Sequence, residues 1–208
     1  MAEGSETFQR FMASTAIDYM KWHDGESYDL EALTALRGDE RDAAEFWLLE
    51  RADKDWRDLE GLLALGTPRA RDAVLRQLRH GRLEQRLSAA RRLADDPATS
   101  DDREAAVIEG LRRAKFGSGL SDALDVAIEH PTPAVRDALL RATMRSESGA
   151  HAAAALEFLA GLAREPFDWA RRPFYLRFNE PAGADGQAAF RELCAELGVD
   201  PAPYLEER

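Results

Sequence analysis

An internal repeat is the feature that most constrains the fold of this chain. The ten residues that begin at Thr67, TPRARDAVLR, match the ten that begin at Thr132, TPAVRDALLR, at eight positions when Val and Leu are treated as equivalent. The copies are 65 residues apart, and a weaker copy of the apolar spacing, carried by Val107, Ile108 and Leu111, follows the first by 33 residues. A period of 32 or 33 residues predicts a series of helix pairs.

Helical spacing of apolar residues, with intervals of three and four, extends over most of the chain. Thr67-Pro68 and Thr132-Pro133 are typical of a helix N-cap followed by the first helical residue. Gly66 and His130-Pro131 are expected to end the preceding helices. Ala, Leu, Arg and Glu are abundant and long β-branched runs are missing, which also favours helix. Further helices are predicted over residues 39–55, 152–163 and 185–197.

This pattern resembles the HEAT-repeat family, particularly its short-unit bacterial branch, over about residues 56–163. The period is shorter than the roughly 40 to 47 residues usual for HEAT units, and the ankyrin and tetratricopeptide signatures are absent. The resemblance implies an all-α fold, an α-solenoid of antiparallel helix pairs with capping helices at both ends. We expect a flexible N-terminus over residues 1–13 and capping helices over 14–55. An aromatic and Arg-rich lid with a C-terminal helix is expected over 164–208.

The charge of the chain disfavours non-specific binding to nucleic acid or anionic membranes, because the net charge is −11. The first 65 residues carry 7 Lys/Arg and 16 Asp/Glu, whereas residues 66–145 carry 15 and 12. The acidic N-terminus lacks the apolar stretch of a signal peptide, and no segment approaches the roughly 18 apolar residues of a membrane span. We therefore expect a cytoplasmic protein without membrane contact.

Arginines of the central segment are candidate binding residues. In HEAT arrays the second helix of each pair lines the inner surface, so these arginines could form a positive groove for a carboxylate-rich protein surface or a phosphate backbone. The alternative is that Arg71-Asp72 and Arg136-Asp137 belong to ion pairs within the array and that the other arginines lie on solvated faces. The candidates are Arg69, Arg76, Arg103 and Arg136.

Two flanking segments supply the other candidates. In the first, Trp22, His23, Asp24, Tyr28 and Asp29 could form a binding pocket, or the two aromatic residues could cover the exposed end of the array. Asp29 is expected to cap a helix. The second segment follows the repeats and combines aromatic residues with arginines, a composition typical of interface hot spots and of stacking platforms for single strands. The alternative is a lid whose arginines pair with acids. Its candidates are Trp169, Arg171, Arg172, Tyr175 and Arg177.

No catalytic apparatus is predicted. The four histidines do not share a helix at the spacing of a metal site, and neither a nucleophile motif nor a phosphate-binding loop is present. The single cysteine, Cys194, is expected on a buried helix face. We therefore expect no metal and no cofactor.

Binding of a protein partner is the function that these features favour. An immunity protein that masks a basic toxin domain, an adaptor and a regulatory subunit all fit the acidic N-terminal third. The alternative is nucleic-acid binding or repair, because the sequence is similar to HEAT-like alkylpurine DNA glycosylases in having central arginines and the run Trp56-Arg57-Asp58. HEAT-like bilin lyases share short repeats, but no chromophore site is identifiable.

Overall fold

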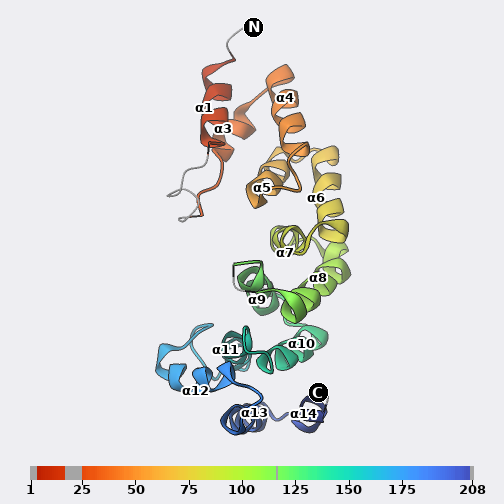
Figure 1. Cartoon of the computed structure of the whole chain (residues 1–208). Coiled ribbons are helices and arrows are strands. Elements are labelled where there is room, and N and C mark those ends of the chain that lie inside the picture. Colours follow the sequence, from red (N-terminus) through yellow and green to blue (C-terminus); the bar gives the residue numbers. More distant parts are fainter. Residues whose placement is uncertain (1–3, 17–24, 116, 207–208) are drawn as a thin grey trace. The chain divides into compact units, whose positions relative to one another are not determined.

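The computed structural model describes residues 4–16, 25–115 and 117–206, and every regular element in these ranges is a helix (Figure 1). The all-α class is therefore confirmed. Within the same ranges, no helix has both the length and the apolar character needed to cross a membrane. The chain divides into two compact units after Arg92. The segment predicted as one array, residues 56–163, thus contributes helices to both units.

In the first unit, the helices of the described chain pack against helices close to them in the sequence. Helix α3 lies against α1 and α5, and α5 also contacts α4, α6 and α7, while α4 and α7 each contact α6. From α4 to α6 each helix therefore packs against the next one, and from α3 to α5 each packs against the next but one. The bounds are α1 Glu6–Ser14, α3 Leu30–Ala35, α4 Gly38–Leu49, α5 Trp56–Leu65, α6 Pro68–His80 and α7 Leu83–Arg92.

The turn between α5 and α6 follows the sequence prediction. Gly66 ends α5 in the left-handed conformation, with φ of 67°, which glycine adopts without a steric penalty. Thr67 then accepts a hydrogen bond from the amide of Ala70 at 3.0 Å, and Pro68 occupies the first turn of α6. The helix predicted over 39–55 is shorter, because α4 ends at Leu49.

Residues 6–13, which the sequence predicted to be flexible, belong to α1. Ser5 caps this helix by accepting from the amide of Phe8 at 3.2 Å. Phe11 is fully buried and packs edge-on against Tyr28 and Trp47, with ring centroids 6.2 Å apart in each pair. Burial of this aromatic ring, which depends on residues distant in the sequence, is what holds the segment in place.

The second unit repeats the packing order of the first. Helix α8 contacts α9 and α10, while α9 and α10 each contact α11. Helix α11 then lies against α12, η3 and α13. The bounds are η1 Pro97–Thr99, α8 Ser100–Arg113, α9 Leu120–Glu129, α10 Pro133–Thr143, α11 Gly149–Leu159, η2 Trp169–Arg171, α12 Arg172–Leu176, η3 Arg177–Asn179, α13 Ala184–Leu197 and α14 Ala202–Glu206.

The two Thr-Pro copies also share a tertiary contact that the sequence did not reveal. The hydroxyl of Thr67 donates to the carboxylate of Glu45 on α4, and the hydroxyl of Thr132 donates to that of Glu104 on α8. In both cases the threonine also caps its own helix, since Thr132 accepts from the amide of Val135 at 3.2 Å. Each threonine therefore joins its helix to the helix two positions earlier.

The aspartates of the two copies differ in their environment. Asp137 pairs with Arg141 at 2.8 Å, four residues later on α10, rather than with its neighbour Arg136. Tyr204 of α14 donates its hydroxyl to the same carboxylate at 2.8 Å, and burial raises the pKa of Tyr204 to about 12. Asp72, the counterpart of Asp137, is exposed.

Replacement of the capping threonine tests the repeated contact. We expect Thr132→Ala to lower the free energy of unfolding by about 1 to 2 kcal/mol, because α10 loses its cap and Glu104 loses a donor. Urea unfolding gives the total effect, and amide hydrogen exchange at Val135 locates it. Ser121→Ala, at an exposed position in the first turn of α9, is the control and should change the stability little. Equal effects of the two substitutions would contradict the assignment.

Candidate functional site

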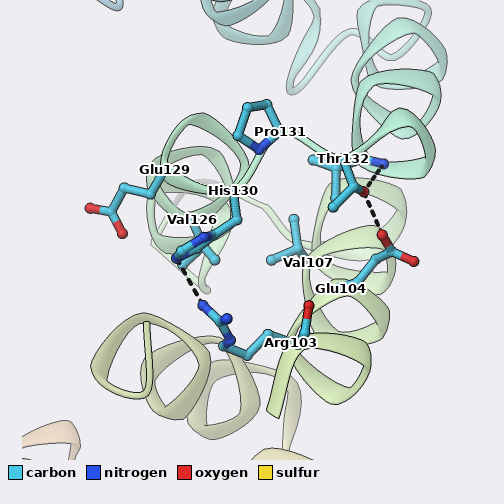
Figure 2. A pocket seen from close by; sticks show the side chains of 10 residues that line it. Arg103, Glu104, Val107, Val126, Glu129, His130, Pro131 and Thr132 are labelled. Atoms are coloured by element: carbon cyan, nitrogen blue, oxygen red, sulfur yellow. Dashed lines mark hydrogen bonds between the residues drawn. The ribbon is translucent and has the colours of Figure 1, made fainter. Parts of the chain in front are cut away.

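A pocket in the second unit contains Arg103, one of the predicted arginines. The pocket has a volume of about 340 Å³ and lies among α8, α9 and the start of α10 (Figure 2). Arg103 and Val107 are four residues apart on α8, so they share one helix face. His130 follows the last residue of α9, where Pro131 prevents the helix from continuing. Helix periodicity and the α9–α10 turn thus place a cation and an imidazole at one cavity.

Arg103 is buried, with only 6% of its surface exposed. Its Nη1 lies 2.8 Å from Nε2 of His130, and its Nε has no hydrogen-bond partner. Because a guanidinium can only donate, His130 accepts through Nε2 in this contact. Among the described residues, no carboxylate oxygen lies within 4.0 Å of this guanidinium. The positive charge of Arg103 is therefore buried without an anionic partner.

The other predicted arginines have different environments. Arg69 and Arg76 are exposed on α6 of the first unit. Arg136 is partly buried on α10, where its Nε donates to the carbonyl oxygen of Pro131 at 3.4 Å. Trp56 lies at the start of α5, and the guanidinium carbon of Arg92 is 4.7 Å from the centroid of its ring.

The aromatic and Arg-rich segment is anchored by a buried carboxylate on α11. Glu157 is fully buried and accepts hydrogen bonds from the guanidinium of Arg171 and, at 2.8 Å, from the hydroxyl of Tyr175. Arg171 also reaches Glu196 on α13 at 3.0 Å. Tyr175 is itself fully buried, and this burial raises the pKa of its hydroxyl. These contacts tie residues 169–176 to both α11 and α13.

A second set of contacts fixes the end of the same segment. Arg177 pairs with Asp185 at 2.8 Å and with Glu192 at 2.7 Å, both on α13. Phe174 lies near the guanidinium groups of Arg171 and Arg177, at 4.7 Å and 5.6 Å from its ring centroid. Arg171 and Arg177 thus form ion pairs of the kind that the lid alternative predicted, whereas Arg172 lies over the ring of Trp169.

Trp169 is the exception in this segment, because 69% of its surface is exposed. Its ring packs edge-on against Phe167, with centroids 5.4 Å apart, and the guanidinium of Arg172 lies 5.7 Å from its centroid. Asp168 caps the short helix that begins at Trp169 by accepting from the amide of Ala170 at 2.9 Å. An exposed indole therefore projects from a segment that ion pairs fix to α11 and α13, one of them to the buried carboxylate of Glu157.

The N-terminal candidates separate into two groups. Trp22, His23 and Asp24 lie outside the described residues. Tyr28 is buried and donates its hydroxyl to Asp58 at 2.8 Å. Asp29 caps α3, as predicted, by accepting from the amide of Ala32 at 2.8 Å and also pairs with Arg10 at 2.7 Å.

Asp58 is the most buried carboxylate near this flank. Its side chain has no exposed surface, Oδ1 accepts from Tyr28 and from Arg51 at 3.4 Å, and Oδ2 has no partner. Burial raises the pKa of Asp58, whereas the hydrogen bond from Arg10 lowers the pKa of Asp29. Arg57 is also buried, lies over the ring of Tyr28 and pairs with Asp55 at 2.7 Å.

Two further groups bear on the predicted absence of catalytic and metal chemistry. Cys194 is buried on α13, as expected, and burial raises the pKa of its thiol to about 11. A thiol with such a pKa is a poor nucleophile at neutral pH. Within residues 4–16, 25–115 and 117–206, no three His, Cys, Asp or Glu side chains gather as a metal site would require.

Sequence reasoning missed His130 and Glu157 as partners of candidate arginines. His130 was read only as part of a helix end, although the Pro that follows it fixes its position. Glu157 is an isolated acid on the Ala-rich helix α11, and such an acid on an apolar face signals a buried pair. Neither sequence pattern identifies the arginine that contacts the residue, because Arg103 is 27 residues from His130 and Arg171 is 14 residues from Glu157.

Comparisons with protein-family models, curated proteins and solved structures find no match for this chain.

The opposite pKa shifts of Asp58 and Asp29 give opposite pH dependences of stability. The folded-state pKa of Asp58 is raised, so its contribution is greatest at low pH and declines as pH rises from about 4. The wild-type stability minus that of Asp58→Asn should therefore fall as pH increases. The folded-state pKa of Asp29 is lowered, so this residue stabilises the fold above about pH 4. The wild-type stability minus that of Asp29→Asn should therefore decrease as pH falls below about 4. Urea unfolding at a series of pH values measures both, and slopes of equal sign would contradict the assignments.

Proposed function

We propose that this chain is a non-enzymatic protein-binding module built from HEAT-like helix pairs. The sequence repeat, the contacts that join alternate helices within each unit, and the paired Thr–Glu hydrogen bonds support a solenoid arrangement of helix pairs. In this proposal α4 and α6 form one layer of the first unit and α5 and α7 the other, while α8 with α10 and α9 with α11 form the two layers of the second unit. Stacked helix pairs provide extended surfaces suited to protein partners.

The single observation that carries the binding role is the exposure of Trp169. Trp, Tyr and Arg are enriched among the interface residues that contribute most to affinity. Here the surrounding aromatic and Arg-rich segment is held by Glu157, Asp185, Glu192 and Glu196, so little side-chain or backbone entropy is lost when a partner covers the indole. Trp169 is therefore the proposed centre of the interface.

A basic partner suits the charge of the chain. Net charge of −11 and exposed acids such as Glu31, Asp39 and Asp42 in the first unit would steer a cationic protein toward it. An immunity protein for a basic toxin domain has this character, and so does an adaptor of a basic protein. The nucleic-acid alternative is weakened by the burial of Arg103 and by the contact between Arg136 and a backbone carbonyl.

Affinity capture with variants tests the proposed interface. The wild-type chain, Trp169→Ala and Phe46→Ala serve as baits for a lysate of the native host, followed by mass spectrometry. Phe46 is the matched control, because it is 54% exposed but lies on α4 of the first unit. We expect one stoichiometric protein partner that Phe46→Ala retains and Trp169→Ala loses. With the purified partner, Trp169→Ala should weaken binding at least about 30-fold, as for other interface hot spots.

Two outcomes would contradict this proposal. Capture of nucleic acid alone, released by moderate salt, would instead support the alternative function. Equal binding of a protein partner by the wild-type chain and by Trp169→Ala would remove Trp169 from the interface. Circular dichroism of each bait checks that the variants are folded.

A further inference from the structure

The cavity beside Arg103 has the features of a ligand site. Burial of a guanidinium is unfavourable unless an anion and hydrogen-bond acceptors replace its hydration. Arg103 meets one acceptor, His130, while its Nε is buried and without a partner. The same side chain lines a cavity large enough for a small molecule. An unpaired buried cation and an adjacent cavity thus occur together.

Interaction with His130 does not compensate the charge of Arg103. The imidazole accepts through the lone pair of Nε2 and brings no negative charge to the contact. It does hold Nη1 at a fixed distance of 2.8 Å, which restricts the guanidinium plane. The guanidinium is therefore already oriented before a ligand binds, and an oriented donor loses less entropy on binding.

The acids around the cavity limit the charge that a ligand can carry. The carboxylate of Glu104 is directed to Thr132, and Glu129 points away from the space between His130 and Val107 (Figure 2). Both still contribute negative potential nearby, which penalises a dianion such as phosphate more than a monoanion. A single negative charge therefore matches the one uncompensated cation.

The remaining lining is mostly apolar, with Ser100 and Thr132 as its polar members. Val107, Val126 and Val135 are almost completely buried and face the cavity together with Pro131. Such a surface favours a short aliphatic body over a polar one. A carboxylate can accept from the guanidinium with two oxygens, which is the geometry that arginine recognises best.

We infer that the cavity among α8, α9 and α10 binds a small monocarboxylate with a short aliphatic body, whose carboxylate pairs with Arg103. This site lies apart from Trp169 in the sequence and does not depend on the protein-binding role. Occupancy of the cavity supplies the anion that Arg103 lacks and fills the space between the valines.

Titration with isovalerate, followed by the ¹H–¹⁵N resonances of arginine Nε and of the backbone amides, tests this site. We expect saturable shifts at Arg103 Nε and over α8 to α10 in the wild-type chain. The neutral amide isovaleramide should leave these resonances in place, and inorganic phosphate should bind more weakly than isovalerate. Arg103→Gln should weaken isovalerate binding about 10- to 100-fold, the effect of losing a hydrogen bond to a charged group.

The control variant is Arg112→Gln, which makes the same charge change at an exposed position of the same helix. It should bind isovalerate as the wild-type chain does. Equal loss in both variants, equal shifts with the amide, tighter binding of phosphate or an absence of saturation would each overturn the assignment. Should Arg103→Gln fail to fold, the Arg103 Nε resonance of the wild-type chain still decides between these results.

Discussion

Burial of apolar helix faces against neighbouring helices of the same unit is the constraint on which the fold depends. A single amphipathic helix of 10 to 14 residues, such as α5 or α8, is only marginally stable in water by itself. Its neighbours supply the apolar surface, and the capping threonines fix where each helix begins. The hydrogen bonds from Thr67 to Glu45 and from Thr132 to Glu104 add a polar contact to this packing at equivalent positions of the two units. Local capping and long-range packing therefore depend on the same residues.

Buried charges have different roles in the two units. Glu157 is buried, but it receives hydrogen bonds from both Arg171 and Tyr175, so its charge is compensated within the chain. Asp58 is only partly compensated, and its raised pKa is the measurable result. Arg103 has no carboxylate partner at all among the described residues, and it alone of these three lines the cavity of the second unit. Incomplete compensation, rather than burial itself, distinguishes the candidate ligand site.

The sequence predicts the helices of this protein well because their signals are local. Thr67-Pro68, Gly66 and Asp29 determine caps and ends through their own backbone preferences, and the structure confirms each of them. Helix α1 was missed because its stability comes from the contact of Phe11 with Tyr28 and Trp47, which local spacing does not encode. The candidate site was predicted only in part for the same reason. Arg103 was recognisable as a residue of interest, but its burial and its contact with His130 arise from the packing of α8 on α9.

The carboxylate of Glu157 also links the folding of two parts of the second unit. Until Arg171 and Tyr175 are in place, closing apolar residues around α11 would bury a charge without its donors, at a cost of several kcal/mol in related cases. The Ala-rich helix can therefore complete its packing only together with residues 169–176. Conversely, detachment of that segment would expose the buried face of α11 to water. Cooperativity between a short irregular segment and a central helix thus rests on one side chain.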